Sequence, residues 1–144
     1  NVSEKYLSWL TQDLNSYIDY TKTNPTYEDL EKYVGERENR NDVLFLGIFT
    51  KDLKHIGNIK YEPIDMSKKT AVMGILIGEI DWRGQGVAAE VIKASGKYLA
   101  KKYKIRNILL GVDASNKFAL SAYKKIGFRI QSQDESSIKM IWTI

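Results

Sequence analysis

A glycine-rich stretch near the middle of the chain has the residue types of an anion-binding site. Gly84 and Gly86 separate a short charged segment from a helical pattern. The first N–H groups of a helix lack intrahelical partners and lie at the positive end of its dipole, so they bind anions, most often phosphate. The residues that would surround the anion are Arg83, Gly84, Gln85, Gly86, Val87, Ala88 and Ala89. A tight turn without a ligand would use the same glycines, so the pattern alone leaves both interpretations open.

The composition excludes several other kinds of chemistry. The chain has no cysteine and a single histidine, His55. Disulfides, thiol nucleophiles and thiolate metal sites are therefore excluded. A histidine-based triad or a zinc site with several histidines cannot be built within this chain either. We expect no metal site, and we interpret His55 as a surface or turn residue between two strands.

A strand and a helix must position the glycine-rich loop. The apolar run Val72–Ile77 predicts a buried strand before it. Gly74 lies inside this run, where glycine often marks a bulge or a close backbone approach. Helical spacing after the loop predicts a helix up to Lys104, with a buried face that holds Val87, Val91, Ala94 and Tyr98.

Two segments, 83–88 and 113–128, together match a known pattern. The first reads Arg-Gly-Gln-Gly-Val-Ala, and the second places Tyr123 seven residues after Asn116 and ends in Gly127-Phe128. In type, order and spacing these residues resemble the two motifs of the GNAT superfamily of N-acetyltransferases. The first resembles that family's Gln/Arg-x-x-Gly-x-Gly/Ala signature, and the resemblance covers roughly residues 43–130.

The resemblance implies an activity and a cofactor. It implies acetyl transfer from acetyl-CoA to a primary amine by direct attack in a ternary complex. The loop at 84–89, helped by Arg83, would hold the pyrophosphate of acetyl-CoA. The pantetheine arm would pair like a strand with Leu76, Ile77 and Gly78. Asn116 would hydrogen-bond the CoA chain, and Tyr123 would protonate the departing thiolate, which needs a nearby O–H donor.

The general base is left open by the sequence. Some members of the family carry a glutamate where this chain has Gly111, and others carry one near the position of Met73. Glu79, just past the central strand, is the first remaining candidate, and Glu62 is the second. A water relay is an equal alternative.

Hydrophobic periodicity and the resemblance together predict the fold. We expect one domain over residues 1–144, of the mixed α/β class, with a central, mostly antiparallel sheet, a splayed parallel βαβ pair and flanking helices. The predicted strands are Val43–Thr50, Ile56–Tyr61, Val72–Ile77, Asn107–Val112, Phe128–Ile130 and Ile138–Ile144, with Glu62-Pro63 ending the second. Besides the central helix, helices are predicted over Ser3–Leu14, after the N-cap Thr26, and over Asn116–Ile126. No strand precedes the first helix, so we expect the family's first strand to be missing from this sequence.

The charge and hydropathy of the chain limit the kinds of partner that it can have. The net charge of +4 comes with scattered lysines, which fits anionic small molecules better than a nucleic-acid groove. No apolar run reaches the roughly 18 residues of a membrane span. We expect a cytoplasmic protein with a small-molecule or peptide amine as acceptor, and no nucleic-acid or membrane partner. Dimers are common among the relatives, so a homodimer is compatible with the resemblance.

The acceptor is open. Residues 55–60 and 74–78 resemble the branch that includes amino-sugar-nucleotide and ribosomal-protein N-terminal acetylases. Polyamines and antibiotics stay as alternatives. The aromatic residues of the first forty positions either pack helices onto the sheet or line an acceptor pocket.

Two other classes of function use the same glycines. A non-catalytic acyl-CoA-binding module would explain the missing base. A Rossmann-type dinucleotide fold would explain the spacing of Gly84, Gly86 and Ala89, but it requires an acid about 20 residues further on. Asp113 lies too far along the chain for that role.

Overall fold

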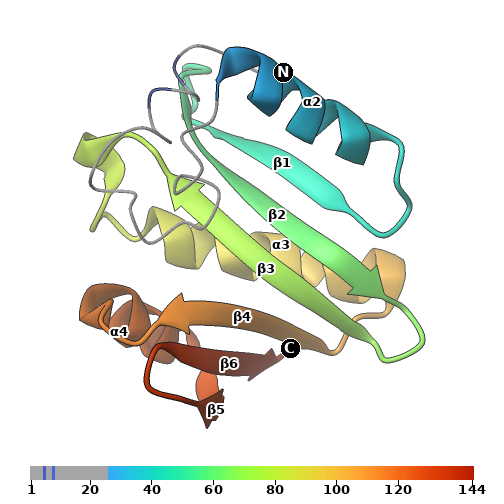
Figure 1. Ribbon diagram of the computed structural model, residues 1–144, viewed down its shortest axis with the longest axis vertical. Helices are drawn as coiled ribbons and strands as arrows, with labels where there is room; N and C mark the ends of the chain where they lie inside the picture. Colours follow the sequence, from blue (N-terminus) through green and yellow to red (C-terminus); the bar gives the residue numbers. More distant parts are fainter. Residues whose placement is uncertain (1–4, 6–7, 9–25) are drawn as a thin grey trace.

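The computed structural model describes Lys5, Ser8 and residues 26–144 (Figure 1). Apart from Lys5 and Ser8, the helix predicted over residues 3–14 lies outside the described residues, as do the aromatic residues between positions 6 and 20. The elements are α2 (Tyr27–Glu38), β1 (Leu44–Phe49), β2 (His55–Asp65), β3 (Thr70–Ile77), the short 3-10 helix η3 (Ile80–Trp82), α3 (Val87–Tyr103), β4 (Asn107–Asp113), α4 (Lys117–Ile126), β5 (Arg129–Gln133) and β6 (Ser137–Thr143).

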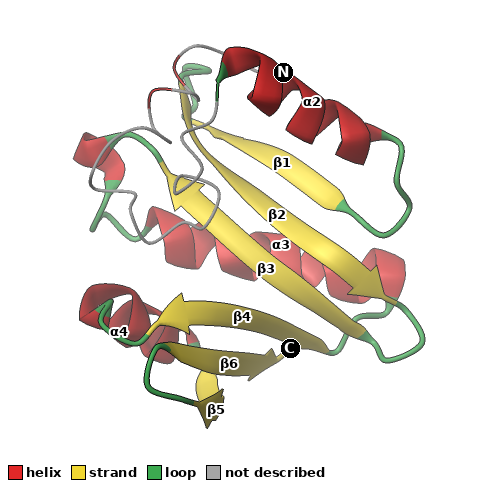
Figure 2. Cartoon of the chain, in the orientation of Figure 1, coloured by secondary structure: helices red, strands yellow, loops and turns green. Residues whose placement is uncertain are grey.

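These strands form one six-stranded sheet in the order β1-β2-β3-β4-β6-β5 (Figure 2). β3 and β4 are parallel and are joined by α3, whereas the other neighbours in this sheet are antiparallel. The predicted mixed α/β fold is therefore confirmed. The Rossmann alternative is wrong, because that fold needs a mostly parallel sheet.

Helix α2 begins as the sequence predicts. The Thr26 hydroxyl accepts a hydrogen bond from the Asp29 N–H, and the Asp29 carboxylate accepts one from the Thr26 N–H. This capping box satisfies two backbone donors that a helix start otherwise leaves without partners.

Strand β2 is longer than predicted. Glu62-Pro63 does not end it, because pairing with β3 resumes at Ile64 and continues to Asp65. The register shifts between Tyr61 and Ile64, and the Glu62–Pro63 peptide bond is cis. The irregularity expected at Gly74 lies instead at residues 62–63, since Gly74 pairs in register with Lys60.

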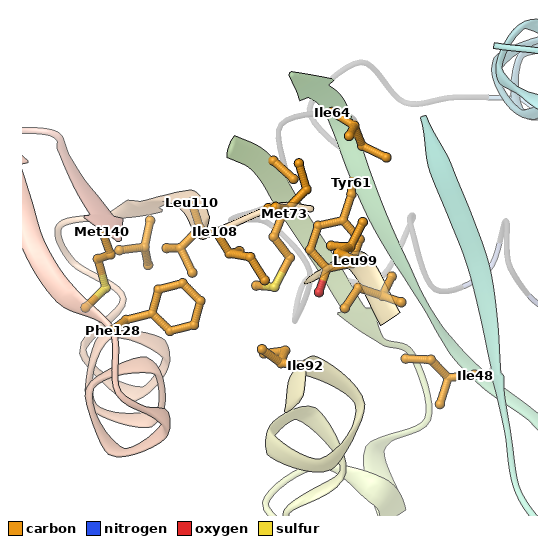
Figure 3. Close-up of a cluster of buried hydrophobic side chains, with 14 of the residues drawn as sticks. Ile48, Tyr61, Ile64, Met73, Ile92, Leu99, Ile108, Leu110, Phe128 and Met140 are labelled. Carbon is orange, nitrogen blue, oxygen red and sulfur yellow. The ribbon is translucent and has the colours of Figure 1, made fainter. Parts of the chain in front are cut away.

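The main core lies between the sheet and α3 (Figure 3). Side chains alternate along a strand, so every second residue faces this core. Tyr61, Met73 and Ile108 meet Ile92 and Leu99 of α3 there. The Ser95 hydroxyl donates to the Val91 carbonyl at 2.6 Å, so the hydrogen bond of 2.7 Å between Tyr61 and Ser95 uses the phenol proton.

The buried face of α3 agrees with the prediction only in part: Val87 and Val91 pack against the core. The helix buries Ile92, Ser95, Gly96 and Leu99, whereas Ala94 is exposed and Tyr98 is 44% exposed. The predicted apolar stripe is displaced by about one residue around the helix axis, because the small residues Ser95 and Gly96 were not counted as core. Gly96 is needed for close packing, since a Cβ there would lie 3.0 Å from Trp142 Cζ3.

None of the helices in the described part of the chain is long and apolar enough to cross a membrane.

Candidate active site

The parallel pair β3–β4 is closed at one end and open at the other. Pairing runs from Thr70–Val72 to Asn107–Leu109 and then stops, although both strands continue. A cavity of about 250 Å³ lies where they part. It is lined by Met73, Gly74 and Ile75 of β3, by Leu110, Gly111, Val112 and Asp113 of β4, and by Asn116, Ala119 and Tyr123.

The divergence begins at Val72. Its pair with Leu109 is the last between β3 and β4. On its other side β2 is irregular, because Ala71 pairs with Ile64 and Met73 pairs with Tyr61. Gly74 and Gly111 then line the cavity without side chains, and a Cβ at either would meet no atom within 4 Å. The two glycines leave the cavity open where the strands separate.

Tyr123 reaches the cavity from α4. Its ring contacts Phe128 edge to face, with centroids 5.7 Å apart. Burial raises the pKa of Tyr123 to about 12, so the phenol is protonated at any physiological pH. The hydroxyl has no hydrogen-bond partner among the described residues, and it is therefore available as a donor to a bound molecule.

Asn116 lines the same cavity as the N-cap of α4. Its Oδ1 accepts a hydrogen bond of 3.2 Å from the Ala119 N–H. Because the oxygen caps the helix, the Nδ2 group is the part of the amide that can donate to a ligand. The structure thus brings Asn116 and Tyr123, two of the predicted site residues, to one cavity.

The predicted phosphate loop has the backbone of an anion site. Gly84 has φ of +72° and Gly86 has φ of +80°, values that favour glycine strongly. Gly86 is the N-cap of α3, and no side chain caps this helix end. The N–H groups of Val87, Ala88 and Ala89 therefore lie at an uncapped N-terminus of a 17-residue helix. Gln85 lies between the two glycines of this turn.

Arg83 connects the loop to β3. Its Nε donates to the Ile77 carbonyl at 2.7 Å. Partial burial lowers the pKa of Arg83, but a guanidinium stays charged in proteins. The loop therefore carries a cation that is tied to the end of the strand beside the cavity.

The segment predicted to pair with pantetheine is partly engaged already. The Gly78 N–H donates to the Ile56 carbonyl of β2 at 2.8 Å. The direction of the backbone N–H and C=O groups alternates along an antiparallel pair. Those of Leu76 therefore also point to β2, whereas those of Ile75 and Ile77 point away from it. The β3 wall of the cavity consists of residues 73–75, just before the predicted segment.

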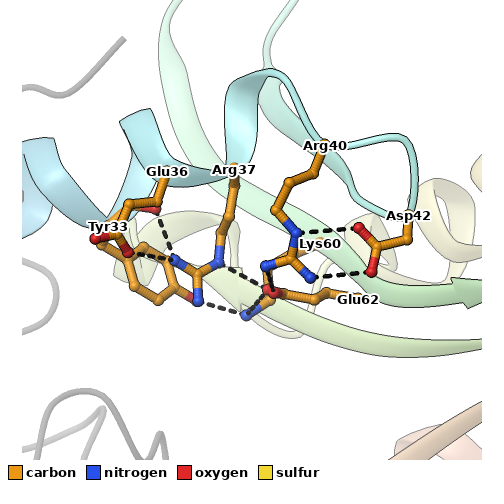
Figure 4. A network of polar contacts seen from close by, with 7 residues as sticks. All are labelled: Tyr33, Glu36, Arg37, Arg40, Asp42, Lys60 and Glu62. Carbon is orange, nitrogen blue, oxygen red and sulfur yellow. Dashed lines mark hydrogen bonds and ion pairs between the residues drawn. The ribbon is translucent and has the colours of Figure 1, made fainter.

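Neither candidate base lines the cavity. Glu79 Oε1 lies 2.6 Å from the Lys5 ammonium. Glu62 accepts hydrogen bonds of 2.7 Å from Arg37 and from Arg40, and its carboxylate is 3.3 Å from Lys60 Nζ (Figure 4). Partial burial alone would raise the pKa of Glu62, but the hydrogen bonds and charges of Arg37 and Lys60 outweigh it and lower that pKa. A carboxylate held this way is a poor proton acceptor.

Glu62 instead joins α2 to the sheet. Arg37 also lies over the Tyr33 ring at 3.7 Å, and the Lys60 ammonium donates to the Tyr33 hydroxyl (Figure 4). The sequence could not show this cluster, because its members are up to 29 positions apart, from Tyr33 to Glu62.

Sequence reasoning missed most of the cavity wall. Leu110, Gly111 and Val112 of β4 were predicted as strand residues only, and Gly111 was considered only as the place of an absent glutamate. The available signal was the expected splay of the parallel pair, which makes both strands' carboxyl halves into walls. The described residues contain no group of three or more His, Asp or Glu side chains that could hold a metal ion.

A comparison of sequences gives a family. The family profile described as the acetyltransferase (GNAT) domain matches residues 3–129 of the chain. A search of curated proteins finds no match.

Comparisons with solved structures give the same architecture. The Microcin C7 self immunity acetyltransferase MccE, in complex with acetyl-CoA and AMP, has a TM-score of 0.82 at 18% identity, over 98% of this chain and 86% of that one. The spermidine N-acetyltransferase of Vibrio cholerae, in complex with CoA and spermine, has a TM-score of 0.74 at 18% identity, over 83% of this chain and 76% of that one. At such identities the two structures indicate a shared fold and do not specify a shared acceptor.

Proposed function

Because the chain belongs to the GNAT family of acetyltransferases, we propose that it transfers the acetyl group of acetyl-CoA to a primary amine in a ternary complex. The observation that carries the proposal is the cavity between β3 and β4, which Asn116 and Tyr123 both line. The two similar structures hold acetyl-CoA or CoA, which supports the same acetyl donor here.

The residues around the cavity fit acetyl-CoA. The uncapped start of α3 and the Arg83 guanidinium would hold its pyrophosphate, as expected for an anion at a helix N-terminus. The pantetheine arm would run along β3 in place of the missing part of β4, using the backbone groups of Ile75 and the N–H of Ile77, which face away from β2, while the Ile77 carbonyl holds Arg83. Asn116 Nδ2 would donate to a carbonyl of that arm.

The reaction needs one bond to form and one to break. The lone pair of the amine attacks the thioester carbonyl carbon, the new C–N bond forms, and the C–S bond breaks with its electrons left on sulfur. Tyr123 would give its proton to that sulfur. A phenol whose pKa is raised to about 12 keeps this proton until a thiolate develops beside it.

The proton that leaves the amine would pass to water. Glu62 is paired with Arg37, Arg40 and Lys60, and Glu79 is paired with Lys5 and lies outside the cavity wall. A water relay needs neither carboxylate at the reacting nitrogen, and Glu79 stays the first candidate for the proton acceptor at the end of the relay. The acceptor would be an amino-sugar nucleotide or a protein N-terminus, as the sequence resemblance implies.

Isothermal titration calorimetry tests the donor. The protein should bind acetyl-CoA and should not bind NAD, which is the matched dinucleotide control. Gly86→Ala should weaken acetyl-CoA binding by about tenfold. A non-glycine residue holds this positive φ at a cost of roughly 1–2 kcal/mol. The loop of the variant would therefore adopt another backbone conformation, and binding would have to restore the original one. Gly35→Ala is the control variant, since a Cβ at Gly35 meets no atom within 4 Å and its φ is not positive.

Two results would contradict the proposal. Absence of acetyl-CoA binding to the folded protein would remove the phosphate-loop assignment. Binding without acetyl transfer to any of a broad set of amines would favour the alternative, a non-catalytic acyl-CoA-binding module.

A further inference from the structure

A buried amide on β2 has an unused donor. Asn58 is only 8% exposed, and its Nδ2 has no hydrogen-bond partner among the described residues. Buried polar groups almost always have partners, because an unpaired one loses its bonds to water without replacement. A donor left this way is explained if a bound molecule supplies the acceptor atom.

The other end of the amide is held in place. Asn58 Oδ1 lies 2.9 Å from His55 Nε2, and since an amide oxygen only accepts, the histidine carries the proton in this contact. The His55 ring is stacked on Phe49, with centroids 4.9 Å apart. Gly47 makes room for that ring, because a Cβ there would lie 2.7 Å from Phe49 Cε2. In this orientation Oδ1 meets the histidine, and Nδ2 is left without an acceptor among the described residues.

Asn58 lies on the sheet face that is turned away from α3. Ile59 and Tyr61 face the core below α3, so Asn58 and Lys60 project from the opposite face. Residues that pair across an antiparallel ladder share a face, so Gly74 opposite Lys60 and Leu76 opposite Asn58 lie on this face too.

The cavity opens on the same face. Gly74 and Gly111 are its two exposed glycine positions, and Gly111 alternates with the buried residues Leu110 and Val112. Because neither glycine has a side chain, the cavity is accessible from this face of the sheet. Asn58 lies one strand away from the β3 wall of the cavity, because its partner Leu76 directly follows the wall residue Ile75. A molecule that enters the cavity from this face would therefore lie on the same side of the sheet as the Asn58 amide.

The charges on this face indicate which kind of amine could bind there. Lys60 is a cation, and Glu62, the carboxylate beside it, is already paired with Arg37, Arg40 and Lys60. Of the two carboxylates on β2, Glu62 is thus already paired with cations, and Asp65, at the far end of the strand, accepts hydrogen bonds from Ser67 and Lys68. A protonated polyamine also offers only donors, and a donor cannot satisfy Asn58 Nδ2. An amine that carries an oxygen acceptor can.

We propose that Asn58 is an acceptor-binding residue, whose Nδ2 donates to an oxygen of the amine substrate, and that the substrate is therefore an oxygen-bearing amine. This inference rests on the proposed acetyltransferase function. The oxygen could be a sugar hydroxyl or a peptide carbonyl, which present the same chemistry to the amide. His55 is a positioning residue that acts through Asn58.

Acetylation kinetics with three acceptors test the assignment. The arms are a nucleotide-linked amino sugar, a tripeptide with a free α-amino group, and spermidine, which has no oxygen. The wild type should acetylate the sugar or the peptide with a higher kcat/KM than spermidine, and the faster arm identifies the source of the oxygen. Asn58→Asp keeps the oxygen that meets His55 and removes the donor, whereas Asn58→Leu removes both polar ends at similar size.

Both variants should lower kcat/KM for the preferred acceptor by about 10- to 100-fold, mainly through KM, while the dissociation constant of acetyl-CoA stays within about twofold. A purely structural asparagine would instead lower the melting temperature and change the kinetics of all three acceptors alike. Asn41→Leu, the same change at an exposed turn, should alter none of these quantities.

Other outcomes overturn the assignment. A preference for spermidine, or acceptor kinetics that both Asn58 variants leave unchanged, would remove Asn58 from acceptor binding and leave the acetyltransferase function standing. A wild type that binds acetyl-CoA but acetylates none of the three amines would overturn the proposed function together with this inference.

Discussion

The two ends of the β3–β4 pair use the same two strands in opposite ways. At the start of the strands, Ala71 and Ile108 pair and are completely buried. Beyond Val72 and Leu109 the strands separate, and the space between them is a cavity instead of core. The closed end supplies free energy of folding, and the open end supplies the walls of the proposed binding site.

Two tyrosines show the same difference. Burial raises the pKa of both Tyr61 and Tyr123 to about 12. The Tyr61 hydroxyl donates to Ser95 and ties β2 to α3, whereas the Tyr123 hydroxyl has no partner among the described residues. The pKa alone therefore does not identify a catalytic tyrosine. The hydrogen bonds around it decide whether the phenol is structural or available to a ligand.

The largest expected effect is at the open end. Tyr123→Phe should lower kcat by about 100- to 10,000-fold, the usual range for a general acid. Its acetyl-CoA affinity and melting temperature should stay close to wild type, because the lost hydroxyl has no partner among the described residues. In the wild type, kcat should not fall from deprotonation of Tyr123 until the pH approaches about 12. Steady-state kinetics, calorimetry and thermal melting measure the three quantities.

Tyr98→Phe is the matched control for that prediction, since Tyr98 is 44% exposed on α3. A Tyr123→Phe enzyme with normal turnover would remove Tyr123 from the mechanism and erase the contrast with Tyr61.

The next effect is at the closed end. Ile108→Ala should cost about 2–5 kcal/mol of unfolding free energy, because Ile108 has 0% exposure and the surrounding strands can fill the hole only partly. Urea unfolding measures the loss. Ile130→Ala is the control, since Ile130 is 39% exposed on β5 and its loss should cost under about 1 kcal/mol. Equal costs at both positions would mean that the closed end is not the anchor of the sheet.

A third effect lies at the level where β3 leaves β4. Glu62→Gln should destabilise the fold at neutral pH by about 1.5–3 kcal/mol, since it weakens charged hydrogen bonds to Arg37 and Arg40. The folded-state pKa of Glu62 lies below its unfolded value of about 4.3. The ionised Glu62 carboxylate therefore contributes its full stabilisation above the unfolded-state pKa, and this stabilisation is lost as the pH falls through the folded-state pKa.

Unfolding curves of wild type and Glu62→Gln from pH 7 to pH 3 should accordingly converge at the acidic end. Glu36→Gln is the control, because that carboxylate is 57% exposed and 4.0 Å from the same Arg37, and such pairs contribute roughly 0–1 kcal/mol. A difference between wild type and Glu62→Gln that does not change with pH would disprove the role of the Glu62 charge.

The smallest expected effect concerns the structural tyrosine. Tyr61→Phe should cost about 0.5–1.5 kcal/mol, because Ser95 loses the proton that it accepts and the loss is that of one net hydrogen bond. Turnover should stay at the wild-type level. Reduced kcat with unchanged stability would reverse the assignment of the two tyrosines, and the same kinetic and melting measurements decide it.

The sequence predicted the local features well because each rests on neighbouring residues. The capping box of Thr26, the glycines of the phosphate loop and the helix that follows Asn116 all depend on side chains within a few positions. The predicted strands were also found, since alternation along a strand is visible in the sequence. The phosphate, pantetheine and catalytic roles of the site residues stay predictions.

Errors arose where distant residues decide the structure. Strand β2 continues past Pro63 because β3 and the loop before β1 bond to its second part, where the Ile64 N–H donates to the Asp42 carbonyl. The buried stripe of α3 is set by how closely Trp142 approaches Gly96, which a hydrophobic pattern cannot record. The cationic partners of Glu62 are likewise set by tertiary contacts, because Arg37, Arg40 and Lys60 come from three different segments.

The sequence by itself therefore determined the family, the glycine turn before α3 and the pair Asn116–Tyr123, because these are short patterns of residue type and spacing. Only the tertiary structure decided where β3 parts from β4, which tyrosine keeps its proton available, and that Asn58 lies one strand away from the β3 wall of the cavity with an unpaired donor. Those properties depend on contacts between β2, β3, β4 and α4. The residues involved are far apart in the chain, so their distances and hydrogen bonds exist only once the sheet has formed.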